Sequence, residues 1–237
     1  MKANALIFDK DGTLIEFDAF WVSLSIKAIQ RVLDDLNIQG ELSNIMEAFG
    51  VHDGVTDING VLCHGTYAQM GEIVYDILKK HKPSLSKEQI IYMVENAYKD
   101  NVCYGEVNPT TKTLKSVLEE LKAKGKKLAV VTTDNEIITR TCLKKLGIEQ
   151  LFDKIYTDNG TFPPKPNPFC ANDFCESFGL DKDQVVMVGD TMTDVKFAKN
   201  AGIKIVSLAQ KEENKAKLCD YADVVIDDLT KLLEIIE

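Results

Sequence analysis

Residues 4–14 read NALIFDKDGTL, and this stretch carries the strongest indication of the fold. Its first part, residues 4–9, is apolar enough to predict a short buried strand. The polar run that follows holds Asp9, Asp11 and then Gly12, which permits a sharp turn and a close backbone approach. Two carboxylates at this spacing suit a nucleophile beside a general acid or base, or a metal site. Taken alone, the pair also fits an ordinary turn.

Further strands are expected only after residue 126. Apolar runs at 127–132, 154–156, 184–188, 204–208 and 224–226 predict strands, and helical patterns alternate with them. This alternation predicts an α/β fold in which helices cover both faces of a parallel sheet. The strand at residues 4–9 is expected to join the same sheet, because a lone strand followed by a long helical stretch makes a poor folding unit.

The chain between residues 17 and 104 is expected to be mostly helical. Apolar residues recur at helical spacing over 20–36 and 67–80, and Ser86 with Gln89 has the form of a capping box before another helix. Residues 50–65 contain four glycines and are expected to form a loop. His52, Asp53 and His64 lie in this loop, and the sequence does not assign them a role.

Four polar clusters follow predicted strands or lie in loops near them. Besides the Asp9 pair, they are Thr132 after KLAVV, Lys165 in a proline-rich loop, and Asp190 with Asp194 after QVVMV. Ligand sites of parallel sheets lie outside the carboxyl ends of the strands, so the clusters could converge. The Thr132 hydroxyl and a helix expected to begin near Asp134 could bind a phosphate. A fixed ammonium could offset its charge, and carboxylates suit Mg²⁺.

In this order, the motifs DKDGT, VVT, a lone lysine in a proline-rich loop and GDTMTD resemble the haloacid dehalogenase superfamily of phosphotransferases. The resemblance covers the whole core. It implies a Rossmann-like catalytic core, residues 1–16 and 105–237, interrupted by an inserted α-helical cap domain, residues 17–104. A cap in this place is similar to the branch that includes phosphoglycolate phosphatase-like enzymes. The implied activity is Mg²⁺-dependent hydrolysis of a small phosphorylated metabolite.

The resemblance also implies catalytic and metal-binding roles for individual residues. Asp9 would attack phosphorus and form an aspartyl-phosphate, while Asp11 would protonate the leaving alcohol and then deprotonate the hydrolytic water. Mg²⁺ would be bound by a carboxylate oxygen of Asp9, the backbone carbonyl of Asp11 and the carboxylate of Asp190. Asp194 would order Lys165 or a metal-bound water from behind these ligands.

The remaining implied roles concern the substrate. Thr132 and Lys165 would hold the phosphoryl oxygens, and Thr133, which stands where related phosphatases often have Asn, would bind beside them. Lys10, at the variable position of the first motif, is expected to point to solvent.

Other activities remain open within the same superfamily. A sugar-phosphate mutase would use the same aspartate pair, although Thr13 favours hydrolysis because such mutases often have Val there. Dehalogenases and phosphonate hydrolases usually lack the second aspartate, so Asp11 argues against both. A non-catalytic phosphate-binding module is a further alternative.

Composition limits the partners and the setting. With 28 basic and 37 acidic residues the formal charge is −9, which argues against binding nucleic acid or an anionic membrane. The apolar runs are too short for a membrane span and the N-terminus lacks signal-peptide features, so a cytoplasmic monomer or small homo-oligomer is expected. The six cysteines form no C-x-x-C pair, and buried reduced thiols are the expectation.

Overall fold

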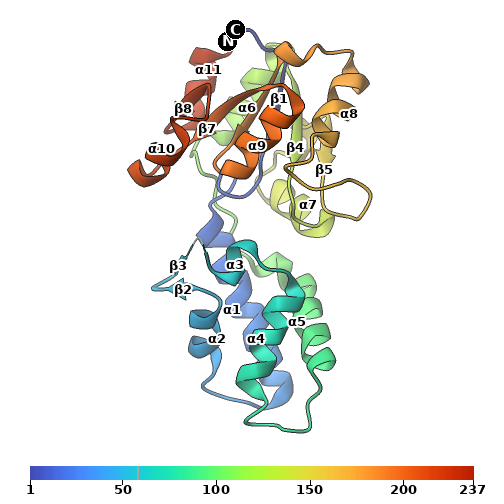
Figure 1. Ribbon diagram of the computed structural model, residues 1–237, viewed down its shortest axis with the longest axis vertical. Coiled ribbons are helices and arrows are strands. Elements are labelled where there is room, and N and C mark those ends of the chain that lie inside the picture. Colours follow the sequence, from blue (N-terminus) through green and yellow to red (C-terminus); the bar gives the residue numbers. More distant parts are fainter. Residues whose placement is uncertain (58) are drawn as a thin grey trace. The chain divides into compact units, whose positions relative to one another are not determined.

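The computed structural model describes residues 1–57 and 59–237, which form two compact units. The first comprises residues 1–16 and 107–237, and the second comprises residues 17–106 (Figure 1). The first unit contains a six-stranded parallel sheet in the order β5-β4-β1-β6-β7-β8. Its strands are β1 (Ala5–Phe8), β4 (Lys127–Val131), β5 (Lys154–Tyr156), β6 (Val185–Gly189), β7 (Lys204–Leu208) and β8 (Val224–Ile226). The predicted α/β class and parallel sheet are confirmed.

Strand β1 lies in the middle of the sheet although it comes first in the chain. It pairs with β4 on one side and β6 on the other, so that Phe8 is opposite both Val130 and Val188. After β1 the chain builds the sheet outward through β4 and β5, then returns to β6 on the other side. The strand order therefore reverses at β1, which is where open α/β sheets form their ligand crevice.

Helices cover both faces of this sheet. On one face, α8 (Phe169–Phe178) and α9 (Met192–Ala201) pack on Ile7, Ala129 and Met187 in a single apolar cluster. The helix α6 (Leu114–Ala123) lies on the side opposite α9 (Figure 1), and α7 (Glu136–Lys145) follows β4. The C-terminal part of the chain adds α10 (Glu212–Leu218) and α11 (Leu232–Ile235). The short, highly charged α10 was not predicted, because it has no continuous apolar stripe.

The second unit is mainly helical. It contains α1 (Phe17–Leu36), α2 (Leu42–Ala48), α3 (Val61–His64), α4 (Tyr67–Leu78) and α5 (Lys87–Asn101). A buried hydrogen bond of 2.6 Å from the Tyr98 hydroxyl, in the last turn of α5, to Ser25 Oγ joins α5 to α1. The capping box predicted at Ser86 is present, with Gln89 as its reciprocal partner.

The prediction of a loop over residues 50–65 is wrong for much of that stretch. A two-stranded hairpin forms there from β2 (Val51–His52) and β3 (Val55–Thr56), followed by α3. Asp53 and Gly54 both have positive φ, 51° and 79°. That pair is the Asp-Gly signal for a tight hairpin turn, which the high glycine content of the region had obscured. Thr56 fixes the hairpin to α1 by donating from its backbone N–H to Asp18 Oδ1 over 3.0 Å.

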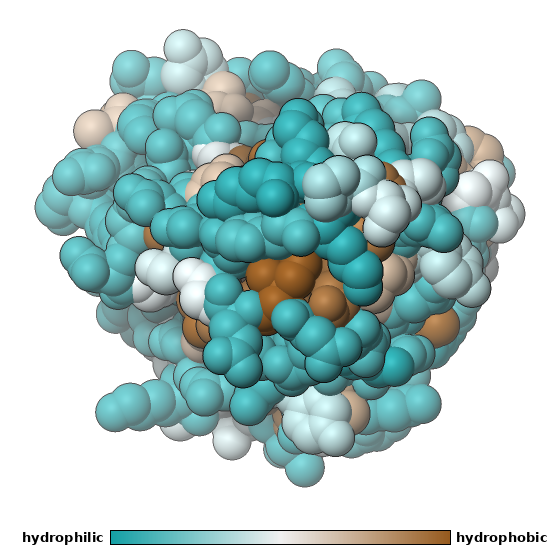
Figure 2. Space-filling view, turned by 90° about the horizontal axis from the view of Figure 1, so that it is seen from below, coloured by the Kyte–Doolittle hydropathy of each residue, from teal (hydrophilic) through white to brown (hydrophobic). Residues whose placement is uncertain are grey.

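The surface is largely polar. Figure 2 shows a face dominated by hydrophilic residues, with a small hydrophobic group near its centre that polar side chains surround. Among the described residues, every helix is too short or too polar to cross a bilayer. No disulfide joins any of the six cysteines, all of which lie among the described residues. The expected burial is only partly right: Cys103 and Cys219 are exposed, whereas Cys142, Cys170 and Cys175 are buried.

A close approach between α4 and α5 depends on Gly71. A Cβ added there would lie 2.6 Å from the Cα of Ile91, well inside van der Waals contact. We expect Gly71→Ala to lower the free energy of unfolding by about 1–3 kcal/mol through overpacking. This loss opposes the gain of ~1 kcal/mol that alanine brings to a helix relative to glycine. Urea unfolding followed by circular dichroism measures it.

The exposed Ala68 in the same helix provides the control. Ala68→Gly measures the difference in helix propensity between alanine and glycine in α4, without the overpacking expected at position 71. A Gly71→Ala protein as stable as the parent or more stable would contradict the proposed crowding.

Candidate active site

Asp9 lies directly after β1, at the point where the strand order of the sheet reverses. Its backbone N–H still donates to Val188 O over 2.9 Å, so the residue is fixed by the sheet itself. The chain then turns tightly, because the carbonyl of Lys10 accepts hydrogen bonds from the N–H groups of both Leu14 and Ile15. Asp9 is 7% exposed, so its carboxylate has little contact with solvent.

Asp190 reaches the same place from the end of β6. Its Oδ1 accepts a hydrogen bond of 2.7 Å from the Thr13 hydroxyl, which joins the loop after β1 to the loop after β6. Gly12 makes this approach possible. It has a φ of +79°, and a Cβ there would lie 2.2 Å from Asp190 Oδ2. The glycine of the Asp-x-Asp-Gly motif is therefore required both by its backbone conformation and by the carboxylate beside it.

Asp194 is held in the first turn of α9. Thr191 is the N-cap of this helix, and its N–H and hydroxyl donate to Asp194 Oδ2 over 3.0 and 2.6 Å. Asp194 is completely buried, and Gly189 leaves room for it, because a Cβ at Gly189 would lie 2.4 Å from the carboxyl carbon.

The ammonium of Lys165 joins two of these carboxylates. Its Nζ donates to Asp9 Oδ1 over 2.7 Å and to Asp194 Oδ1 over 2.6 Å, and the side chain is only 4% exposed. The loop that carries Lys165 is attached to α9, since Asn200 Nδ2 donates to Pro166 O over 3.0 Å. A lysine that would ordinarily be solvated is thus fixed inside the site by two charge-assisted hydrogen bonds.

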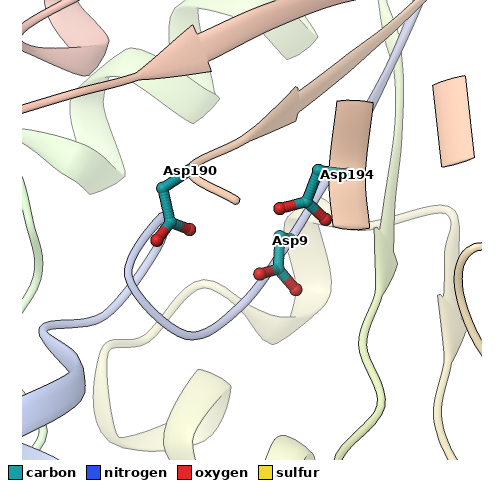
Figure 3. A group of neighbouring side chains, drawn as sticks. All are labelled: Asp9, Asp190 and Asp194. Carbon is teal, nitrogen blue, oxygen red and sulfur yellow. The ribbon is translucent and has the colours of Figure 1, made fainter. Parts of the chain in front are cut away.

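The carboxylates outnumber this cation. Asp9, Asp190 and Asp194 lie beside one another (Figure 3), and one oxygen from each lies within 4.8 Å of the others. Burial raises the pKa of Asp9 to about 7; Lys165 opposes the shift and the charge of Asp194 adds to it. Burial also raises the pKa of Asp190 well above its usual range, with further increases from Asp9 and Asp194. Because the buried negative charges exceed the positive ones, a further positive charge would be stabilised here. A hard divalent cation fits, since all of the available ligand atoms are oxygens.

The hydrogen bonds indicate which oxygens a cation could use. Both oxygens of Asp194 are already engaged, Oδ1 by Lys165 and Oδ2 by Thr191, which fits an orienting role behind the metal ligands. Within residues 1–57 and 59–237, no group donates a hydrogen bond to Asp9 Oδ2 or Asp190 Oδ2. These two atoms therefore suit a metal ion.

The loop after β4 brings Thr132 and Thr133 to the carboxyl end of the sheet. Thr132 is 6% exposed, and its Oγ1 accepts a hydrogen bond of 3.1 Å from Asp134 N, so its own hydroxyl hydrogen can be donated to a ligand. Thr133 is exposed. The following helix begins at Glu136 with Asn135 as its N-cap, close to the start near Asp134 that the sequence predicts.

The expectation that Lys10 points to solvent is wrong. Its side chain is fully buried, and its Nζ lies 2.8 Å from Asp11 Oδ1 and 3.0 Å from Asp134 Oδ2. The two carboxylates compensate a charge that could not otherwise remain inside. Burial raises the pKa of Asp134 to about 6, while the neighbouring Lys10 pulls it back down. Sequence reasoning placed Asp134 only near the start of a helix and missed its pairing with Lys10, because the two residues lie far apart in the sequence, in the loops after β1 and β4.

Comparisons with known proteins agree with this geometry. The family described as haloacid dehalogenase-like hydrolases matches residues 3–202. The chain belongs to that family. Its relatives include the pyrophosphatase PpaX of Halalkalibacterium halodurans, 27% identical over 100% of this chain and 98% of the relative. The phosphoglycolate phosphatase of Mannheimia succiniciproducens is 31% identical over 65% of this chain and 69% of the relative.

The fold of this haloacid dehalogenase-like hydrolase is shared with solved structures. The hydrolase YfnB of Bacillus subtilis, solved bound to magnesium, has a TM-score of 0.68 at 16% identity and covers 99% of both chains. The superfamily predicted from the sequence motifs is confirmed. The chain is a hydrolase of the phosphatase type, acting on phosphate esters.

Crowding at Gly12 gives a test of the site's geometry. We expect Gly12→Ala to lower kcat/KM by roughly 100-fold, because the added Cβ would displace Asp190 and a displacement of about 1 Å in an active site costs that much. Steady-state assays of phosphate release measure the effect.

Gly125 offers a matched control. It has nearly the same φ, +77°, but nothing lies within 4 Å of an added Cβ. Gly125→Ala therefore introduces the same backbone strain away from the site, and we expect it to reduce stability without reducing kcat/KM. Equal losses of activity in the two variants would show that strain alone, and not the displacement of Asp190, is responsible.

Proposed function

We propose that this chain is a magnesium-dependent phosphatase that hydrolyses a small-molecule phosphate monoester through an aspartyl-phosphate at Asp9. The observation that carries the proposal is the Lys165 ammonium held between Asp9 and Asp194, with Asp190 beside them. Phosphoryl transfer requires that the reacting groups be positioned and that their charge be neutralised. The buried carboxylate at the point where the strand order reverses, the fixed cation and two oxygens that suit a metal ion would serve these needs.

In the first half-reaction a carboxylate oxygen of Asp9 attacks phosphorus. The bond from phosphorus to the ester oxygen breaks, its electron pair stays on that oxygen, and the oxygen takes a proton from Asp11. The products are the free alcohol and a phosphoryl group bound to Asp9. Lys165 and the Thr132 hydroxyl would donate to the phosphoryl oxygens as charge builds up on them, and Thr133 would bind substrate beside them.

In the second half-reaction water attacks the phosphorus of the aspartyl-phosphate and gives its proton to Asp11. The bond from phosphorus to Asp9 breaks, and its electron pair restores the carboxylate. The sum is ester plus water giving alcohol plus phosphate, with both aspartates returned to their starting states. Asp11 thus acts first as an acid and then as a base.

Carboxylate oxygens of Asp9 and Asp190, with the backbone carbonyl of Asp11, would hold Mg²⁺. Bound there, the ion would supply positive charge that offsets the repulsion between a carboxylate nucleophile and a phosphate dianion. Asp194 would orient Lys165 from behind this set, as its hydrogen bonds indicate.

The substrate is proposed only as a class. The name of one relative specifies phosphoglycolate and that of another, aligned over the full length, specifies pyrophosphate. Hydrolysis of inorganic pyrophosphate is therefore a second candidate, in which phosphate replaces the alcohol as leaving group and the same residues act. A sugar-phosphate mutase would instead return an isomer of its substrate with little free phosphate.

A panel of phosphate esters and pyrophosphate tests the proposal, with Mg²⁺ and with EDTA. We expect release of phosphate that requires Mg²⁺ and that falls by about four orders of magnitude or more in Asp9→Asn, as for other nucleophile replacements. Asp227→Asn is the matched control, because this exposed carboxylate follows β8 of the same sheet. Its activity should equal that of the parent. No release from any compound by a folded, metal-binding protein would overturn the proposal.

Metal binding should depend on pH through Asp9. The pKa of Asp9 is raised from 3.8 to about 7, so the folded state without a cation is favoured by protonation and loses stability as pH rises from about 4 to 7. Mg²⁺ needs the ionised form. We therefore expect Mg²⁺ to raise the Tm more at pH 8 than at pH 6, measured by thermal melts at a fixed concentration.

Asp190→Asn removes one ligand and should abolish most of this Mg²⁺-dependent increase at both pH values. Increases of equal size at pH 6 and pH 8 in the parent protein would contradict competition between the proton and the cation.

A further inference from the structure

The loop after β1 contains a second buried lysine, which takes no part in the steps above. Lys10 has no exposed surface, and its ammonium lies between Asp11 Oδ1 at 2.8 Å and Asp134 Oδ2 at 3.0 Å. Removing an ammonium from water costs several kcal/mol, even when it is paired. An apolar side chain would fill the same space without that cost, so packing alone does not account for a lysine here.

The partners of Lys10 lie on different loops of the site. Asp11 is the proposed proton donor and acceptor, and it follows Lys10 directly. Asp134 belongs to the loop after β4, where its N–H donates to Thr132 Oγ1 over 3.1 Å and its Oδ1 accepts from Asn135 N over 2.7 Å. The carbonyl of Asp134 also accepts a hydrogen bond of 2.8 Å from Asp158 N, in the loop after β5.

We propose that Lys10 is a positioning residue that holds the carboxylate of Asp11 in place for proton transfer, by joining it to Asp134 on the loop that carries Thr132. The inference rests on the proposed function, because it assigns a support to the proton shuttle of that reaction. The ion pair engages Oδ1 of Asp11. Lys165 then holds the proposed nucleophile, and Lys10 positions the proposed acid.

The leaving group distinguishes positioning from a purely structural role. An alkoxide must be protonated as the bond to phosphorus breaks, whereas p-nitrophenolate leaves without a proton near neutral pH. A misplaced Asp11 should therefore slow phosphoryl transfer from an alkyl phosphate and hardly change it from p-nitrophenyl phosphate. The second half-reaction uses Asp11 with either compound, so p-nitrophenyl phosphate is followed by the pre-steady-state burst of nitrophenol.

Two variants distinguish the effect of losing the Lys10 charge from the effect of a failure to fold. Lys10→Met leaves the carboxylates of Asp11 and Asp134, 17% and 7% exposed, without the cation between them and can fail to fold. We expect the double variant Lys10→Met with Asp134→Asn, which removes the cation and one anion together, to regain the Tm of the parent without regaining the link to Asp11. Lys126→Met is the control, because Lys126 is another buried lysine, and its Nζ bonds the main-chain oxygens of Ala3 and Glu237 at 2.7 and 2.6 Å, outside the site.

For the double variant we expect kcat on the best alkyl phosphate of the panel to fall by roughly 10- to 100-fold at unchanged KM, within the range of general acid catalysis. The burst rate with p-nitrophenyl phosphate should stay within about threefold, because its leaving group needs no acid. Lys126→Met should change both rates equally or not at all. A crystal structure of the double variant should show the Asp11 carboxylate displaced.

Two results would overturn the inference while leaving the proposed function intact. One is an active parent protein in which the double variant slows both compounds by the same factor, or slows neither. The other is an Asp11 carboxylate that keeps its place without Lys10. A parent protein that hydrolyses nothing in the panel would instead overturn the proposed function, and the crystal structure would then still decide whether Lys10 positions Asp11.

Discussion

The site depends on one electrostatic constraint: three carboxylates crowd together at the end of a buried sheet, where like charges repel strongly. Lys165 neutralises part of this charge from within, since it bonds Asp9 and Asp194 at once. The negative charge that remains favours the binding of a hard cation. Charge that would be costly in a folded core becomes useful here, because a phosphate dianion can approach a carboxylate only where positive charge has been concentrated. An overall charge of −9 is compatible with this, since the positive charge is local.

The topology of the sheet explains how so few residues come together from so far apart. Strand β1 is short, fully buried and flanked by β4 and β6, so the loops that follow these three strands necessarily open at one edge. Glycines then permit contact at distances that any side chain would prevent: Gly12 admits Asp190, and Gly189 admits Asp194. The helix α9 contributes its first turn, where capping by Thr191 also orients the carboxylate that holds Lys165. Fold and site are therefore built from the same hydrogen bonds.

Sequence reasoning predicted the six strands of the sheet because buried parallel strands are continuous apolar runs with polar residues directly after them. It predicted the convergence of Asp9, Lys165 and Asp190 from their places after those strands, and their roles stay predictions. It failed where the local sequence pattern was misleading, or where the structure depends on residues far apart in the chain. The hairpin at 51–56 was hidden by glycines, and α10 by its charge. The burial of Lys10 could not be predicted, because it depends on Asp134, whose position is known only once β1 and β4 are paired.

The central position of β1 also has a consequence for the order in which the protein is made. The helical unit is one continuous segment, residues 17–106, so all of its contacts are available as soon as that segment leaves the ribosome. Strand β1 is synthesised before it but must wait for partners near residues 127 and 185. Throughout that interval an apolar strand with two unpaired edges precedes a finished domain, which exposes it to chaperones and to misassembly. Asp9, the proposed nucleophile, follows β1 directly and so reaches its final place only after β4 and β6 have been made.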